Sequence, residues 1–189
     1  MIRHAPTLLF AVLLAGPVCA RDAAVDRLKA DLLAGNSATV TLGQWCAAEK
    51  LADPPAIRAL RDPVAVSPSA ETRALLRVGP DEPVRYRRVK LACGSHVLSE
   101  ADNWYVPSRL TPAMNTALDT GDTPFGAAVK ALDFHRRTLD TRTDAGPGTV
   151  LQVRALLLTP DGTPFSLVVE NYGTGLVSPE VVSRNANSK

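Results

Sequence analysis

Apolar and polar positions alternate most clearly in two neighbouring stretches near the middle of the chain, Val84–Cys93 and Val97–Val106. Neither stretch has the spacing of an amphipathic helix, and the second ends in the aromatic-rich Trp104-Tyr105-Val106 before Pro107. Between the two lies Cys93-Gly94-Ser95, which suits a turn. The pattern therefore predicts two strands joined as a hairpin at the centre of a sheet.

A second hairpin is predicted near the C-terminus, where Val150–Leu158 and Pro164–Val169 flank the turn residues Thr159-Pro160-Asp161-Gly162. Asp140–Gly148 is expected to be a loop. Further strands are expected at Ile57–Val66, Arg73–Val78 and Phe134–Leu139.

Helical spacing is found in two pairs of segments. The first pair is Asp22–Leu33 and a helix that Ser37 or Thr39 caps and that runs to about Leu51. The second pair begins at Pro112 and at Thr123-Pro124, and it ends near Gly121 and Leu132. Because the helices come in pairs and the strands mostly as hairpins, we expect an α+β fold in which paired helices cover one face of an antiparallel sheet.

The first twenty residues are typical of an export signal. Arg3 and His4 precede an apolar run, Leu8–Ala15, that is too short to span a bilayer, and small residues follow at Val18-Cys19-Ala20. We expect cleavage after Ala20 and a periplasmic or secreted protein; the alternative is a lipoprotein that begins at Cys19. This leaves a single domain, 21–177, and a polar, flexible tail, 178–189.

Charge and composition exclude several classes of partner. The formal net charge is +2, and the loss of Arg3 with the signal lowers it to about +1. No overall field therefore draws the protein to nucleic acid or to an anionic membrane, and a monomer is expected. The histidines His4, His96 and His135 lack the spacing of metal ligands, and no phosphate-binding glycine loop is present, so no metal and no cofactor are expected.

Two cysteines, Cys46 and Cys93, would remain after cleavage. An even number in an exported chain favours a disulfide bond, which would close a loop of about 48 residues and stabilise the fold by roughly 4 kcal/mol. The alternative is a pair of buried thiols that act as small hydrophobic side chains.

Three charged residues are candidates for a binding site. Arg87 and Arg88 are neighbours on a predicted strand, so their side chains point to opposite faces. If one face packs on the core, one arginine is buried and needs a partner such as a carboxylate; alternatively, both reach solvent from an edge strand. Glu170 follows the apolar run Phe165–Val169 and either reaches water or pairs with Arg88 around a small acidic ligand.

Taken together, these residues resemble chorismate pyruvate-lyase and the wider chorismate lyase/UTRA-like fold. The resemblance is carried by Arg85-Tyr86 with Arg88, by Cys93, by Val106-Pro107, by Thr123-Pro124-Phe125-Gly126, and by Gly162-x-Pro164 with Glu170. It implies a six-stranded antiparallel sheet with a buried pocket under helical flaps, and no metal or cofactor. In that family the enzymes, which are carbon–oxygen lyases, release pyruvate from chorismate to give 4-hydroxybenzoate.

The resemblance also implies roles for individual residues. Arg88 matches the arginine that binds the aromatic carboxylate, and Glu170 matches the acid at the far end of the pocket, so both are the candidate catalytic residues. Phe125 stands where a leucine backbone amide contacts the ligand, and Ala38 where another amide does. Two hypotheses follow: a lyase acting on chorismate or a related acid, and a non-catalytic exported protein that binds a small aromatic carboxylate.

Overall fold

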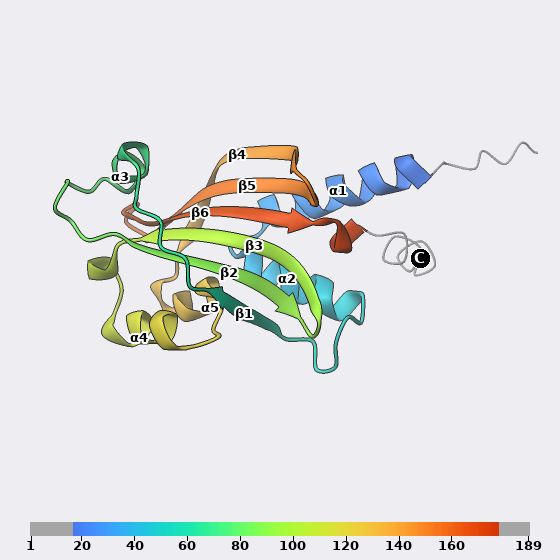
Figure 1. The fold of residues 1–189 in the computed structure, drawn as a ribbon, viewed down its shortest axis with the longest axis horizontal. Coiled ribbons are helices and arrows are strands. Elements are labelled where there is room, and N and C mark those ends of the chain that lie inside the picture. Colours follow the sequence, from blue (N-terminus) through green and yellow to red (C-terminus); the bar gives the residue numbers. More distant parts are fainter. Residues whose placement is uncertain (1–16, 178–189) are drawn as a thin grey trace, which may run out of the picture.

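Six strands form one antiparallel sheet in the computed structural model, which describes residues 17–177. The strands are β1 (Ile57–Asp62), β2 (Arg85–Cys93), β3 (His96–Tyr105), β4 (His135–Gly146), β5 (Thr149–Leu158) and β6 (Pro164–Gly173). They lie in the order β1-β2-β3-β6-β5-β4, so β1 and β4 are the two edges (Figure 1). Both predicted hairpins, β2–β3 and β5–β6, and the antiparallel pairing are confirmed.

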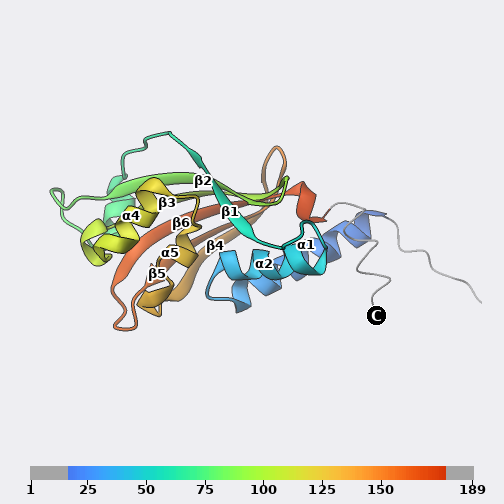
Figure 2. The ribbon, with the colours of Figure 1, turned by 90° about the horizontal axis from the view of Figure 1, so that it is seen from below.

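Four helices cover one face of this sheet, which we call the inner face. They are α1 (Pro17–Ala34), α2 (Ala38–Ala48), α4 (Pro112–Thr120) and α5 (Phe125–Ala128). Figure 2 shows α4, α5 and α2 one after another from left to right across the strands. Short 3-10 helices lie at Pro107–Arg109, Lys130–Leu132 and Thr174–Val177. The predicted helix pairs are therefore present, and they cover one face as expected.

The core lies between the inner face and these helices, and it has two parts. Side chains of α1 and α2, such as Leu28, Leu42 and Trp45, pack on Val89 of β2 and Val153 of β5. Those of α4 and α5 pack on the opposite end of the same face, where they meet Tyr105, Ala155, Phe165 and Val168. The α2 start and α5 are therefore neighbours over the middle of the sheet.

The other face, which we call the outer face, is only partly covered. Helix α3 (Ala70–Leu76) packs Leu76 against Leu156 and Leu167 at one end. Elsewhere the face carries ion pairs, such as Lys90 with Glu100 at 3.4 Å. An antiparallel sheet with one wetted face explains the alternation of apolar and polar residues along β2 and β3.

Two predictions of secondary structure are wrong. The segment predicted as a strand at Arg73–Val78 belongs mostly to α3, because Ser69 caps a helix there and its hydroxyl accepts a hydrogen bond from the backbone of Thr72 at 3.0 Å. The segment predicted as a loop at Asp140–Gly148 mostly continues β4 to Gly146. It does so because β5 begins at Thr149 and pairs with residues 140–143 and with Gly146.

A disulfide bond joins Cys46 of α2 to Cys93 at the end of β2, with Cα atoms 6.0 Å apart. This confirms the predicted bridge. Both cysteines are fully buried, and the bond ties α2 to the sheet.

Parts of the predicted organisation lie outside the described residues, namely the tail 178–189 and all of the export signal except 17–20. Helix α1 already includes Val18-Cys19-Ala20, so cleavage after Ala20 would remove the first four residues of α1. Among the described helices, none combines the length and the apolar character needed to cross a bilayer.

Candidate functional site

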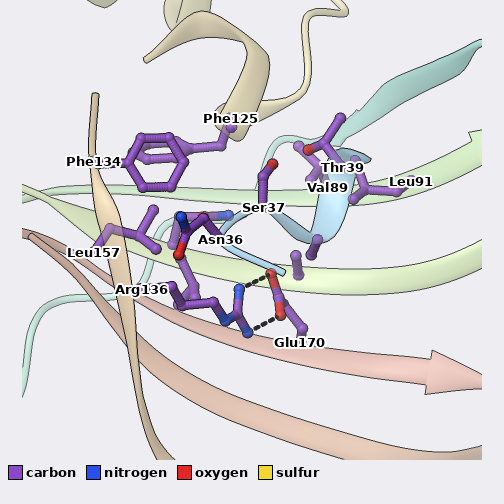
Figure 3. Close-up of a pocket in the computed structure, with 15 residues that line it drawn as sticks. Asn36, Ser37, Thr39, Val89, Leu91, Phe125, Phe134, Arg136, Leu157 and Glu170 are labelled. Carbon is purple, nitrogen blue, oxygen red and sulfur yellow. Dashed lines mark hydrogen bonds and ion pairs between the residues drawn. The ribbon is translucent and has the colours of Figure 1, made fainter. Parts of the chain in front are cut away.

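A small cavity lies on the inner face, between the sheet, the start of α2, and α5. It is lined by Asn36, Ser37, Ala38, Thr39, Val89, Leu91, Ala101, Asn103, Phe125, Gly126, Phe134, Arg136, Leu157, Val168 and Glu170. Its volume is about 30 Å³, which is enough for about one water molecule. Figure 3 shows Phe125 and Phe134 on one side of the cavity and the Arg136–Glu170 pair on the other.

Arg136 and Glu170 form a buried, two-pronged ion pair. The Arg136 Nη1 donates to Glu170 Oε1 at 3.1 Å and Nη2 donates to Oε2 at 2.5 Å, while the Tyr172 hydroxyl donates to Oε2 at 2.8 Å. The side chains of Arg136 and Glu170 are only 4% and 8% exposed. Such a fork is the arrangement in which an arginine and a carboxylate can be buried together.

The strand order explains how the two residues meet. Arg136 is on the edge strand β4 opposite Leu157 of β5, and Glu170 is on β6 opposite Val153 of β5. Between these two positions the inner row of β5 carries only Ala155. The arginine therefore reaches across β5 over its smallest inner side chain.

Burial and charge act in opposite directions on Arg136. Burial disfavours its charge, but the Glu170 carboxylate and its hydrogen bonds outweigh burial, so the pKa of Arg136 is raised above its ordinary value. Burial also raises the pKa of Tyr172, and the neighbouring Glu170 raises it further. Arg136 is therefore a charged donor and Tyr172 a neutral one.

The start of α2 forms the wall opposite the sheet. Ser37 is the N-cap residue, its hydroxyl makes no capping bond, and its Oγ is buried without a hydrogen-bond partner among the described residues. The first N–H groups of a helix have no partner within the helix, so Ala38 and Thr39 can offer theirs to the cavity. Gly126 of α5 packs here so closely that a Cβ atom would lie 2.7 Å from Ser37 Oγ.

Arg87 is the other buried arginine of the inner face. It is 4% exposed, and its Nη2 donates to the carbonyl of Thr123 at 3.0 Å. Its Nε and Nη1 have no hydrogen-bond partner among the described residues. Burial, with a smaller effect of Arg61, lowers the pKa of Arg87 to about 10.

Arg87 lies next to the cavity. Its partner across the β2–β3 pair is Asn103, which lines the cavity, and so does Val89, two residues further along β2. Thr123, which accepts its hydrogen bond, is two residues before Phe125. Arg87 therefore lies beside the cavity, next to Asn103, whereas Glu170 is part of its lining.

No known protein-family model matches this chain. It is 43% identical over 175 residues to the uncharacterized protein y4mC of Sinorhizobium fredii (strain NBRC 101917 / NGR234), an alignment that covers 79% of this chain and 73% of y4mC. The chain belongs to the y4mC family.

Solved structures with the same fold are distant in sequence. The effector domain of PhnF from Mycobacterium smegmatis superposes with a TM-score of 0.50 at 12% identity and covers 62% of this chain and 81% of that domain. The longer PhnF structure gives a TM-score of 0.51 at 13% identity over 65% of this chain, which spans 60% of PhnF. This member of the y4mC family therefore has the chorismate lyase/UTRA-like α+β fold, as predicted.

The structure brings together three of the four residues predicted for ligand binding. Ala38, Phe125 and Glu170 all line the cavity. Arg88 does not: it lies on the outer face, 38% exposed, with ion pairs to Asp62, Glu100 and Asp102. The predicted pairing of Arg88 with Glu170 is wrong, because the register of β2 turns Arg87, not Arg88, toward the core.

Sequence reasoning missed two residues of the site. Arg136 is within a charged run, His135-Arg136-Arg137, that is typical of an exposed strand, and only the pairing of β4 with β5 reveals which of the three points inward. Asn103 precedes the aromatic pair Trp104-Tyr105, and nothing in the sequence around it indicates a binding site. Among the described residues, no group of three His, Cys, Asp or Glu side chains is arranged to hold a metal ion.

Proposed function

We propose that the protein binds a small aromatic monocarboxylate on the inner face, with the carboxylate at Arg87 and the ring toward Glu170. The observation that carries this proposal is the buried Arg87 guanidinium, of which two nitrogen atoms lack a hydrogen-bond partner in the part of the chain that the structure describes. A buried donor without a partner costs free energy, and a carboxylate accepts from a guanidinium through two parallel hydrogen bonds.

The charges near the cavity favour a single negative charge on the ligand. Arg136 and Glu170 neutralise each other, and Asp119, which is near Arg87, is paired with Arg85 at 2.7 Å. Arg87 therefore contributes one positive charge that no ion pair within residues 17–177 compensates. The N–H groups at the start of α2 favour an anion as well.

The walls favour an aromatic or similarly flat apolar body. Phe125 and Phe134 lie on one side, and Val89, Leu157 and Val168 lie along the sheet. Since about 30 Å³ does not hold an aromatic ring, α5 and the start of α2 must move apart when the ligand enters. In support of a binding role, the PhnF domain with the same fold is described as an effector domain.

Release of pyruvate from chorismate is the second candidate function. The observation in its favour is that Glu170 does line the cavity, as the resemblance to chorismate pyruvate-lyase requires. Against it, the carboxylate is held by Arg136 and Tyr172, which leaves it poorly suited to give a proton to a leaving group.

One experiment separates the two. Purified protein is titrated with 4-hydroxybenzoate by calorimetry, and pyruvate is measured after incubation with chorismate. We expect saturable binding of 4-hydroxybenzoate and no pyruvate. Catalytic release of pyruvate would establish the lyase, and failure to bind any benzoate-type acid would contradict the proposal.

We also propose that the protein acts outside the cytoplasm. The sequence supports this with the signal-like residues 1–20, and the buried Cys46–Cys93 bond is typical of an oxidising compartment. N-terminal sequencing of the exported protein should begin at Arg21. A lipid-modified Cys19 at the N-terminus, or recovery of the intact chain from the cytoplasm alone, would contradict this expectation.

A further inference from the structure

The carboxylate of Glu170 has almost no free hydrogen-bonding capacity. A carboxylate offers about four lone-pair positions, two on each oxygen. Within the described part of the chain, Oε2 accepts from Arg136 and from Tyr172, while Oε1 accepts only from Arg136. One acceptor position therefore remains, on Oε1, for a ligand.

The end of the cavity at Glu170 is also electrically neutral. Among residues 17–177, Arg136 and Glu170 are the only charged residues that line the cavity, and they are paired with each other. Without Arg136, Glu170 would be a buried, uncompensated anion. Arg136 thus determines whether a ligand meets a neutral ion pair or a negative charge at Glu170.

We propose that Arg136 sets the ligand specificity of this site by holding Glu170 as an ion-paired acceptor. The cavity then selects aromatic acids that carry a neutral O–H or N–H donor opposite their carboxylate. It rejects aromatic acids that carry a second anionic group. The inference rests on the proposed function, since it takes a carboxylate at Arg87 as the fixed end. Arg136 is a positioning residue, because it acts through Glu170.

The same geometry predicts a switch of specificity. Substituting Glu170→Gln keeps the shape of the side chain but removes its charge, which leaves the Arg136 guanidinium buried and without its anion. A para-dicarboxylate could then satisfy both buried arginines, Arg136 in the wall of the cavity and Arg87 beside it. The variant should prefer the ligand that the wild-type protein rejects.

The test compares 4-hydroxybenzoate with terephthalate by calorimetry. Wild-type protein should bind 4-hydroxybenzoate at least about tenfold more tightly than terephthalate, and Glu170→Gln should reverse this order. Tyr172→Phe is the matched control, because it removes one hydrogen bond from Glu170 but keeps the ion pair, and it should retain the wild-type order.

A series on the wild-type protein covers the case in which Glu170→Gln does not fold. Here 4-hydroxybenzoate and 4-aminobenzoate, which carry donors, should bind more tightly than 4-methoxybenzoate, which carries only an acceptor. Equal affinities in this series would overturn the role of Arg136, as would an unchanged order in Glu170→Gln. Absence of binding of every acid to the wild-type protein would instead overturn the proposed function, and this inference with it.

Discussion

Burial of the Arg87 guanidinium lowers the stability of the free protein, and a ligand that pairs with it would remove this free-energy cost. The guanidinium of Arg87 is buried, two of its nitrogen atoms have no hydrogen-bond partner within residues 17–177, and burial lowers its pKa to about 10. Residues of this kind are retained for binding rather than for stability, because an apolar side chain of similar volume usually packs at least as well.

Substitution of the two neighbouring arginines should therefore have different effects on ligand affinity. Arg87→Met should weaken binding of 4-hydroxybenzoate by about 2 to 5 kcal/mol, because it removes a charge-assisted contact, while leaving stability equal or higher. Arg88→Met is the control on the outer face and should leave affinity unchanged. Calorimetry and urea unfolding measure the two effects; a loss of affinity in Arg88→Met alone would refute the assignment.

This pair of residues also shows what sequence can and cannot reveal about the site. The sequence leaves open whether one of two adjacent arginines is buried or both reach solvent. Because side chains alternate along a strand with a period of two, a shift of one residue would also exchange the faces. Here the faces are decided by Val89 and Leu91, which pack under α1 and α2. The resemblance to chorismate pyruvate-lyase pointed to Arg88, and only the three-dimensional register identifies Arg87.

At the scale of elements, α2 is held more firmly than the other wall of the cavity. Both walls pack on the inner face, but α2 is also joined to β2 by the Cys46–Cys93 bond, whereas the α4–α5 segment is tied to the β1 edge by exposed pairs such as Arg58–Asp122 at 2.7 Å. Exposed ion pairs of this kind contribute little to stability. The α4–α5 segment is therefore the part that should open.

Ligand binding should accordingly slow hydrogen exchange in α4 and α5. Backbone amides in Pro112–Ala128 are expected to exchange faster than those of α2 in the free protein and to become protected in saturating 4-hydroxybenzoate. Helix α3, on the outer face, serves as an internal control and should not change. If the ligand slows hydrogen exchange in α2 and not in α4–α5, the conclusion that the α4–α5 segment opens would be contradicted.

The disulfide bond gives a second prediction at this scale. Replacing both Cys46 and Cys93 with alanine should lower the free energy of unfolding by about 4 kcal/mol, since the bond closes a loop with a sequence separation of 47 residues. In the unfolded, unreduced protein, neither cysteine should react with a thiol reagent. Modification of either one under those conditions would contradict the bond.

Elements with strong end signals were predicted well, and those that depend on a partner were not. The turns after Leu158 and Cys93 and the proline at the start of the helix at Pro112 are local features, and the corresponding hairpins and helix are present. By contrast, β4 continues past Asp140 only because β5 lies beside it. The apolar residues of Arg73–Val78 favour a strand when taken alone, but the Ser69 cap makes most of the segment helical.

At the scale of the whole molecule, all three tyrosines titrate above their ordinary range. Burial is the first cause for each: the pKa of Tyr86 is raised to about 12, with Asp102 as the second cause, and the pKa values of Tyr105 and Tyr172 are also raised. The folded state therefore keeps its phenolic protons at a pH at which the unfolded chain loses them.

The stability of the protein should then fall in alkaline solution. Below about pH 10 both states hold these protons and this effect is absent; above it the unfolded chain binds fewer protons, so the free energy of unfolding decreases as pH rises. Unfolding in urea at a series of pH values measures this slope, and Tyr86→Phe should make it shallower. A stability that rises over this range in the wild-type protein but not in Tyr86→Phe would contradict the assignment.

The ion pair between Arg136 and Glu170 has a mechanical consequence. It spans β5 and joins the edge strand β4 directly to β6, so β4 is fastened to the sheet by a side-chain tie in addition to its own ladder. Separation of β4 from the sheet would break this ion pair and, at the same time, disrupt the side of the cavity that the sheet forms. Binding of a ligand in the cavity and attachment of β4 to the sheet therefore depend on the same ion pair. A bound ligand would stabilise the attachment of this edge strand.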